Sequence, residues 1–411
     1  MSAPSLTAPP LIRTPTVSRL PGIEGLRGIA ALAVVVFHVQ SVVGSSTTAL
    51  AYLQPIGMLD QGVTLFFVLS GFLLYRPFAA HLLGLSPRPA SGRYLANRVL
   101  RIFPAYIFVL LVTSLVLRMA WLPRETDGAS IRFGSLNWFD TITAALLLHG
   151  TTPRSIRSGL EVAWTLTIEF GFYLLLPALC AVIGHALRRF GNPLVAALGT
   201  PIVLLGLGLF GKLWQLNSLA AVLPSERHNL GWGANWSAVL ARSIFMSADL
   251  FAYGMIAAVI VVAVGQDAKL QARLRLSRAP LIATAVLIAT LVVTHILKGI
   301  FTSSWVAVGA AALVLAVVSS EQRSTLRRIL DSRLCLWCGQ VSFSIYLWHL
   351  PVIRWMKLNG FVAPDNLLGF ILNIVLIGSI TLLLSAATYY LIEVQALKLK
   401  QFIIPARSSL A

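Results

Sequence analysis

The sequence predicts an all-α polytopic membrane protein with about ten transmembrane helices and one short re-entrant or interfacial segment. Hydrophobic residues make up 57% of the 411-residue chain. Charged residues make up only 11%, whereas soluble proteins carry about 25%. The apolar residues also gather in stretches of about 20, the length of a helix that crosses a bilayer. We therefore expect a multi-pass integral protein of the cytoplasmic (plasma) membrane.

The expected spans follow one another with short connections. Residues 1–20 are rich in Pro, Ser and Thr and are expected to form a disordered cytoplasmic tail. Residues 21–395 are expected to form the membrane domain, and 396–411 a short basic cytoplasmic tail. After a first helix that begins near residue 21, the other spans are expected near 62–80, 101–120, 163–187, 193–214, 238–264, 280–298, 301–320, 335–358 and 367–392. The apolar stretch 139–149 is too short to span, so it is expected to be re-entrant or interfacial.

The loop charges indicate the orientation of these spans, because Lys and Arg accumulate in cytoplasmic loops. The loops 41–61 and 359–366 carry no Lys or Arg, whereas alternate connections and the C-terminal tail are basic. Ten helices with both termini in the cytoplasm fit every loop except 118–162, which would lie outside with five arginines. If 139–149 did span, all later loops would invert and the rule would fail repeatedly.

The remaining composition excludes several classes of function. The formal net charge of +18 reflects the loop arginines, and no basic run is interleaved with aromatic residues as in nucleic-acid-binding proteins. The three cysteines, Cys180, Cys335 and Cys338, are odd in number and lie in apolar settings, which argues against a disulfide framework. No group of Cys, His and carboxylate residues has metal-ligand spacing, so no metal is expected.

The first expected helix carries two costly polar residues, Arg27 and His38. Eleven residues of α-helix turn through about 1100°, which is roughly 20° more than three full turns. Both side chains therefore lie on one face, about 16 Å apart along the axis. Because ionisable residues at membrane depth are expensive, each is expected to have a partner.

Other polar residues fall inside expected spans. Glu169 lies between Trp164 and Tyr173, and Tyr173 is one turn further along the same face. Tyr346 and His349 form a polar stripe with Ser342, which equally fits hydrogen bonds between helices.

Four further charged residues form two pairs. Arg98 and Arg101, at spacing i, i+3, point the same way at the expected entrance of the third helix. They are either orientation anchors or a clamp for a phosphorylated cytoplasmic ligand, since Arg matches phosphate geometry. Arg242 and Asp249 are seven residues apart and are expected to form a structural pair on one helix face.

Taken together, these residues resemble the motifs of the integral-membrane acyltransferases called acyltransferase family 3. The resemblance covers about residues 20–395, and the motifs occur in the family's order. They are Arg27…His38, Gly62–Phe72, Arg98…Arg101 with Pro104, Trp164–Tyr173, Ser344–His349 and Tyr390–Glu393. Three positions depart from the pattern: Thr64 replaces a frequent Asp, Phe170-Gly171 replaces Glu-Gln, and Val394-Gln395 lacks the usual Pro.

The resemblance implies transfer of an acyl group, commonly acetyl, from acyl-CoA to a hydroxyl of a carbohydrate-containing acceptor. That acceptor is expected to be a surface polysaccharide, a glycolipid or a glycosylated metabolite such as a macrolide. The expected partners are acyl-CoA as co-substrate, the acceptor and the lipid bilayer, with no bound cofactor and no nucleic acid. The alternative is a non-enzymatic transporter or flippase that uses its buried charges as a proton relay.

The expected site joins these residues into one mechanism. His38 is expected to act as general base on the acceptor hydroxyl or to carry the acyl group covalently, and the sequence leaves both open. Arg27 is expected to steady the donor or its carbonyl oxygen, and Glu169 to orient His38 or bind the acceptor. Arg98 and Arg101 are expected to hold the phosphates of the donor. Supporting roles are expected for Trp164, Tyr173, Ser344, Tyr346 and His349.

Overall fold

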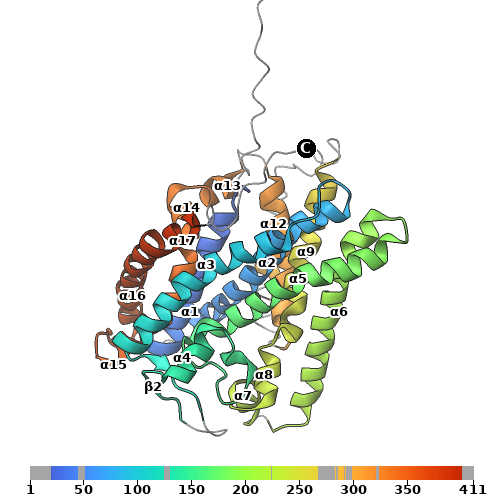
Figure 1. Ribbon diagram of the computed structural model, residues 1–411. Coiled ribbons are helices and arrows are strands. Elements are labelled where there is room, and N and C mark those ends of the chain that lie inside the picture. The colour runs from blue at the N-terminus through green and yellow to red at the C-terminus, as the bar shows by residue number, and fades with distance from the viewer. Residues whose placement is uncertain are drawn as a thin grey trace, which may run out of the picture.

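The computed structural model is a bundle of helices (Figure 1). It describes residues 20–44, 51–124, 130–223, 225–266, 299–320 and 324–399, together with 283, 286–290 and 292. Within these residues, eight helices are long and apolar enough to cross a membrane. The all-α, multi-helix class is thereby confirmed, whereas the placement of both termini in the cytoplasm stays a prediction.

Two of the ten predicted spans are not among these eight helices. The predicted span 280–298 lies largely outside the described residues. The predicted span 335–358 is two helices, α14 (Arg333–Gln340) and α15 (Ser342–Leu358). They meet at Val341, where the Ser342 hydroxyl donates to the Gly339 carbonyl 2.7 Å away. Each of the two helices is therefore shorter than the usual span of about 20 residues.

Up to residue 188, the described part of the chain forms four long helices. They are α1 (Ile23–Val43), α2 (Gly62–Leu82), α3 (Ser91–Leu111) and α5 (Trp164–Arg188). A 3-10 segment, η2 (Ala51–Gln61), precedes α2, and a π-helical turn, η3 (Val112–Val116), continues α3. Because α3 begins with a polar stretch, its start at Ser91 is earlier than the predicted 101. Arg98 and Arg101 consequently lie inside α3 rather than at its entrance.

The connection between α3 and α5 is compact. Its two short strands, β1 (Ala120–Trp121) and β2 (Phe133–Gly134), pair antiparallel, with Ala120 opposite Gly134. The predicted short segment forms α4 (Trp138–Ala145), which has eight residues and exposes Trp138 and Phe139. Two 3-10 turns, η4 (His149–Thr151) and η5 (Glu161–Ala163), lead into α5.

The second half completes the bundle. Its elements are α6 (Pro193–Ala220), α7 (Arg227–Trp232), α8 (Trp236–Ala241), α9 (Ile244–Val264), α12 (Thr302–Ser319), α13 (Thr325–Leu330), α14, α15, α16 (Leu367–Thr388), the π-helical turn η6 (Tyr389–Glu393) and α17 (Val394–Lys398). At the upper end of the molecule in Figure 1 lie the first turns of α1, together with α13, α14 and α17. The lower end holds α4, β2, α7 and α8 (Figure 1). Because α1 runs from the upper end to the lower, it connects the two ends of the bundle.

Helices α2 and α9 pack closely at the centre because each helix places a glycine against the backbone of the other. A Cβ atom on Gly254 would lie 1.9 Å from the Val68 carbonyl oxygen. A Cβ on Gly71 would lie 2.1 Å from the Phe251 carbonyl oxygen. Small residues of this kind let membrane helices approach each other closely. The Phe251 ring then stacks on Phe172 of α5, with 4.2 Å between centroids, which fixes α5 against the same pair.

We predict that Gly254→Val lowers the thermal stability of the protein, because its side chain must displace the backbone of α2. Overpacking of this kind costs about 1–3 kcal/mol of folding free energy. The matched control is Gly378→Val on α16, where a Cβ meets no atom within 4 Å. Thermal unfolding in detergent should show a lower Tm for Gly254→Val only, and equal Tm values for the two variants would contradict this packing.

Candidate active site

Two cavities lie between the helices, and they share one wall. The first, which we call the arginine cavity, is partly open to solvent and encloses about 710 Å³ between α1, α2, α3, α5 and α15. The second, the histidine cavity, encloses about 1170 Å³, also partly open, and is lined by His38. Val63, Phe67 and Tyr346 line both cavities and therefore form the wall between them.

The arginine cavity gathers three cations from two helices. Arg27 comes from α1, and Arg98 and Arg101 come from α3. The guanidinium of Arg98 lies over the ring of Tyr173, 5.9 Å from its centroid. Arg27 has Glu24 at 3.8 Å and lies within electrostatic range of Arg101. The structure thus brings together three of the predicted site residues, although α1 and α3 are far apart in sequence.

Glu169 is the carboxylate that lines the arginine cavity. It accepts hydrogen bonds from the Ser70 hydroxyl and from the Tyr173 hydroxyl, the latter at 2.5 Å. It also lies within electrostatic range of Arg27. Among the described residues, none of its hydrogen bonds reaches His38, so Glu169 lines the cavity of Arg27 and does not orient the imidazole. The alternative expectation, that Glu169 binds the acceptor, stays a prediction.

His38 instead contacts His349. The Nδ1 atom of His38 is 2.9 Å from the Val34 carbonyl oxygen and 3.3 Å from Nε2 of His349. The two imidazole rings are 4.9 Å apart, and His349 is fully buried. The Nδ1 atom of His349 is in turn 3.2 Å from the Ile345 carbonyl oxygen. Two helices, α1 and α15, therefore hold one histidine pair.

The carbonyl partners assign a tautomer to each imidazole, since a carbonyl oxygen only accepts hydrogen bonds. His349 carries its proton on Nδ1 and donates it to Ile345, which leaves its Nε2 as an acceptor. His38 carries its proton on Nδ1, which donates to Val34 and faces Nε2 of His349. The Nε2 atom of His38 is then unprotonated and makes no hydrogen bond among the described residues. That atom is the one able to take a proton or an acyl group.

A carboxylate that the sequence did not single out lies in the histidine cavity. Glu161 accepts from Nη2 of Arg157 at 2.5 Å and from Nη2 of Arg354 at 3.1 Å. Its charge reaches His38 through space. The excess of arginine in the predicted external loop 118–162 was the sequence signal for this network. The structure shows that one of those arginines lines a cavity.

Arg157 is held between two tryptophans. Its guanidinium lies 4.0 Å from the ring centroid of Trp121 and 4.4 Å from that of Trp232. Burial lowers the pKa of Arg157 to about 10, so the side chain stays charged at neutral pH. Arg157 adopts a positive φ of 78°, a conformation that is uncommon for residues other than glycine. Trp164 and Trp232 also line the cavity.

The predicted pair of Arg242 and Asp249 is wrong. Helix α9 begins at Ile244, so Arg242 lies in the preceding turn and does not share a helix face with Asp249. Arg242 stacks over Trp232, 3.2 Å from its centroid. Asp249 is fully buried and pairs with Lys212 of α6 at 2.5 Å. Burying the Asp249 carboxylate without an ion partner would cost several kcal/mol. The buried Lys212 ammonium supplies that partner, and the sequence did not single out this lysine.

The hydroxyls of α15 connect helices. The Tyr346 hydroxyl is 2.8 Å from the hydroxyl of Thr165, and Tyr346 lies in the wall between the cavities. The Ser344 hydroxyl donates to Glu393 of η6 at 2.5 Å. These bonds fit the interhelical role that the sequence left open for this stripe.

Comparison with known proteins identifies the family. Residues 20–390 match the profile of the family described as an acyltransferase domain, Acyl_transf_3. The chain belongs to acyltransferase family 3. It is 25% identical to the acyltransferase MdmB of Streptomyces mycarofaciens, over 83% of this chain and 81% of that protein. It is 23% identical to the peptidoglycan O-acetyltransferase OatA of Listeria monocytogenes, over 71% of this chain and 44% of that protein. No solved structure matches the chain.

Proposed function

We propose that this membrane acyltransferase moves an acyl group, with acetyl as the first candidate, from acyl-CoA to a hydroxyl of a carbohydrate-containing acceptor. The observation that carries the proposal is the pair of adjoining cavities. One gathers three arginines, and the other presents an imidazole with an unprotonated Nε2. A peptidoglycan O-acetyltransferase among the similar proteins supports transfer to oxygen.

The arginine cavity is proposed to hold the donor. Arginine presents its donors in a planar fork that suits phosphate and carbonyl oxygens. Arg98 and Arg101 would bind the donor beside its thioester, and Arg27 would polarise the thioester carbonyl. Glu169 would keep Arg27 in place and, through Ser70, link α2 to α5.

The histidine cavity is proposed to hold the acceptor. Trp164 and Trp232 line it with aromatic rings, while Asp60, Gln61 and Gln215 supply hydrogen-bonding groups. Pockets for ligands of mixed polarity combine such aromatic walls with a few polar side chains. A sugar, with apolar C–H faces and hydroxyl edges, fits this lining. A surface polysaccharide, a glycolipid and a glycosylated metabolite all carry that chemistry.

The proposed chemistry centres on Nε2 of His38. As general base, this atom takes the proton of the acceptor hydroxyl while the oxygen attacks the thioester carbonyl carbon. The C–S bond then breaks, and the thiolate of CoA receives the proton from the imidazolium. In the covalent route, Nε2 itself attacks the carbonyl carbon, and the C–S bond breaks so that CoA leaves as its thiolate. The acceptor hydroxyl then attacks the acyl-imidazole, the C–N bond breaks, and the hydroxyl proton passes to the thiolate. In both routes, a positive charge develops on His38, and Nε2 of His349 stabilises it by accepting from Nδ1.

The first experiment is to delete the gene and compare surface glycans, glycolipids and secreted metabolites by mass spectrometry. The proposal expects the deletion to remove one O-acyl mass from one of these classes, which identifies the acceptor. Purified wild-type protein should then transfer that acyl group from acyl-CoA in vitro. A protein that moves the molecule across vesicle membranes without modifying it would instead be a transporter.

We predict that His38→Ala reduces kcat by about 100-fold or more, since a positioned general base contributes about 10²–10⁴ in rate. The variant should keep the wild-type Tm in detergent and the wild-type elution volume. Transfer at the wild-type rate by this folded variant would rule out both routes through Nε2.

We predict that His349→Gln retains most of the wild-type kcat, whereas His349→Leu lowers it about tenfold or more. A glutamine oxygen can accept from Nδ1 of His38, but leucine cannot, and hydrogen bonds to charged groups are worth about 1.5–3 kcal/mol. The KM values of donor and acceptor should change little in either variant. Equal kcat values for the two variants would leave His349 with a packing role alone.

We predict that Arg98→Gln combined with Arg101→Gln raises the KM for acyl-CoA about tenfold, because charge-assisted bonds to the donor are lost. The reciprocal control is Trp232→Leu in the histidine cavity, which should raise the KM for the acceptor instead. Steady-state kinetics with each substrate varied in turn distinguishes the two effects. A double variant that affects only the acceptor KM would reverse the assignment of the cavities.

A further inference from the structure

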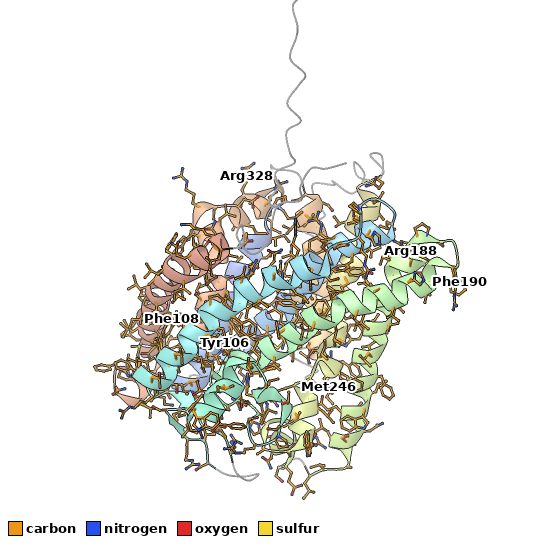
Figure 2. The ribbon with its side chains drawn as sticks, in the orientation of Figure 1. Tyr106, Phe108, Arg188, Phe190, Met246 and Arg328 are labelled. Carbon is orange, nitrogen blue, oxygen red and sulfur yellow. The ribbon has the colours of Figure 1, made fainter. Side chains whose placement is uncertain are left out.

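A third hollow, which we call the basic pocket, lies between the ends of α2 and α5. It encloses about 430 Å³, part of it open to solvent, and four basic side chains line it: His81, Arg88, His185 and Arg188. Arg188 lies at the exposed end of α5, close to Phe190 (Figure 2). The pocket belongs to none of the motifs of the proposed reaction.

The charges of this pocket are not balanced locally. Residues 62–124 and 170–225, which supply all of its lining, contain no Asp or Glu. Elsewhere in the described part of the chain, arginines such as Arg154 and Arg354 pair with carboxylates. Two arginines that share one hollow without a carboxylate repel each other unless an anion lies between them.

The guanidinium of Arg188 is held in place. Its Nη2 atom donates to Nε2 of His81 at 3.0 Å and to the His81 carbonyl oxygen at 3.1 Å. A guanidinium only donates, so Nε2 of His81 is the acceptor, and the proton on Nδ1 faces the Ser86 carbonyl oxygen 3.1 Å away. Among the described residues, the Nε and Nη1 groups of Arg188 have no hydrogen-bond partner. The fork is thus oriented before any ligand arrives.

The basic pocket lies one helical turn beyond the arginine cavity along α2 and α5. Leu74 and Tyr173 line the arginine cavity, and Phe78 and Pro177, one turn further along the same two helices, line the basic pocket. From Glu169 to Ala181 the axis of α5 rises about 18 Å. In CoA, roughly 13 bonds separate the sulfur from the first phosphorus. Fully extended, with the same length per bond as a polypeptide backbone, they span about 15 Å.

We propose that the basic pocket binds a phosphate group, and that this group is the 3′-phosphomonoester at the nucleotide end of the acyl-CoA donor. The inference rests on the proposed function only for the identity of the donor. A thioester beside Arg27 and Glu169 would place the nucleotide one pantetheine length away, where the fork of Arg188 faces the hollow. A phosphomonoester carries a charge of about −1.5 to −2 at neutral pH, which the two arginines neutralise. Anionic phospholipid headgroups carry the same chemistry and are the competing source of phosphate.

The test measures binding and needs no turnover. The Kd of CoA and of 3′-dephospho-CoA is measured by calorimetry for the full-length protein in phosphatidylcholine nanodiscs. The test variant is Arg188→Gln, and the matched control is Arg189→Gln, which removes the same charge from the neighbouring position. The Arg189 guanidinium stacks on Phe190, 5.3 Å from its ring centroid. For an exposed charge-assisted pair, we expect Arg188→Gln to weaken CoA about five- to tenfold. It should leave 3′-dephospho-CoA nearly unchanged, and Arg189→Gln should change neither Kd.

A second arm repeats the CoA titration in nanodiscs that contain phosphatidylglycerol. One outcome would assign the pocket to lipid headgroups and overturn the donor assignment. In that outcome, the lipid competes with CoA in the wild type but not in Arg188→Gln, and the substitution affects CoA and 3′-dephospho-CoA equally. Equal behaviour of the two arginine variants in both arms would overturn the phosphate site itself. CoA binding that depends on Arg188 in a protein without transfer activity would keep the site and reject the proposed function.

Discussion

The two-cavity arrangement depends on the hydrogen bond between Tyr346 and Thr165, which holds Tyr346 in the wall between the cavities. Tyr346 belongs to α15 and Thr165 to α5, while Val63 and Phe67 of α2 complete the wall. The proposed transfer requires the thioester carbonyl to come within reach of His38, so this wall is where donor and acceptor would meet.

Buried charge determines which helices must adjoin one another. In an apolar medium, a lone ion costs several kcal/mol, and the cost falls only with a close partner. Glu169 is bonded to Ser70 from another helix, Asp249 to Lys212, and Glu161 to Arg354. Each link joins elements that are far apart in sequence. The polar groups of the site therefore also hold the bundle together around the cavities.

The sequence predicted the residue types of the site better than their partners. The motif residues Arg27, Arg98, Arg101 and Glu169 do meet in one cavity. Apolar stretches also located most long helices, because burial in lipid is recorded directly in composition. Helical spacing within one segment, however, cannot reveal contacts between segments. That is why the carboxylate expected beside His38 is in the other cavity, and the histidine pair depends on a residue 311 positions away. The start of α9 after Arg242 was also hidden, since a short break in a helix leaves little trace in hydropathy.

The central claim is that donor and acceptor approach the wall from different cavities. Cryo-electron microscopy of the full-length protein with a non-hydrolysable acetyl-CoA analogue tests it most directly. The account predicts density for the acetyl end beside Arg27 and Tyr346, with the nucleotide end in the basic pocket between the ends of α2 and α5. Density for the analogue among Trp164, Trp232 and Glu161 in the histidine cavity would contradict it.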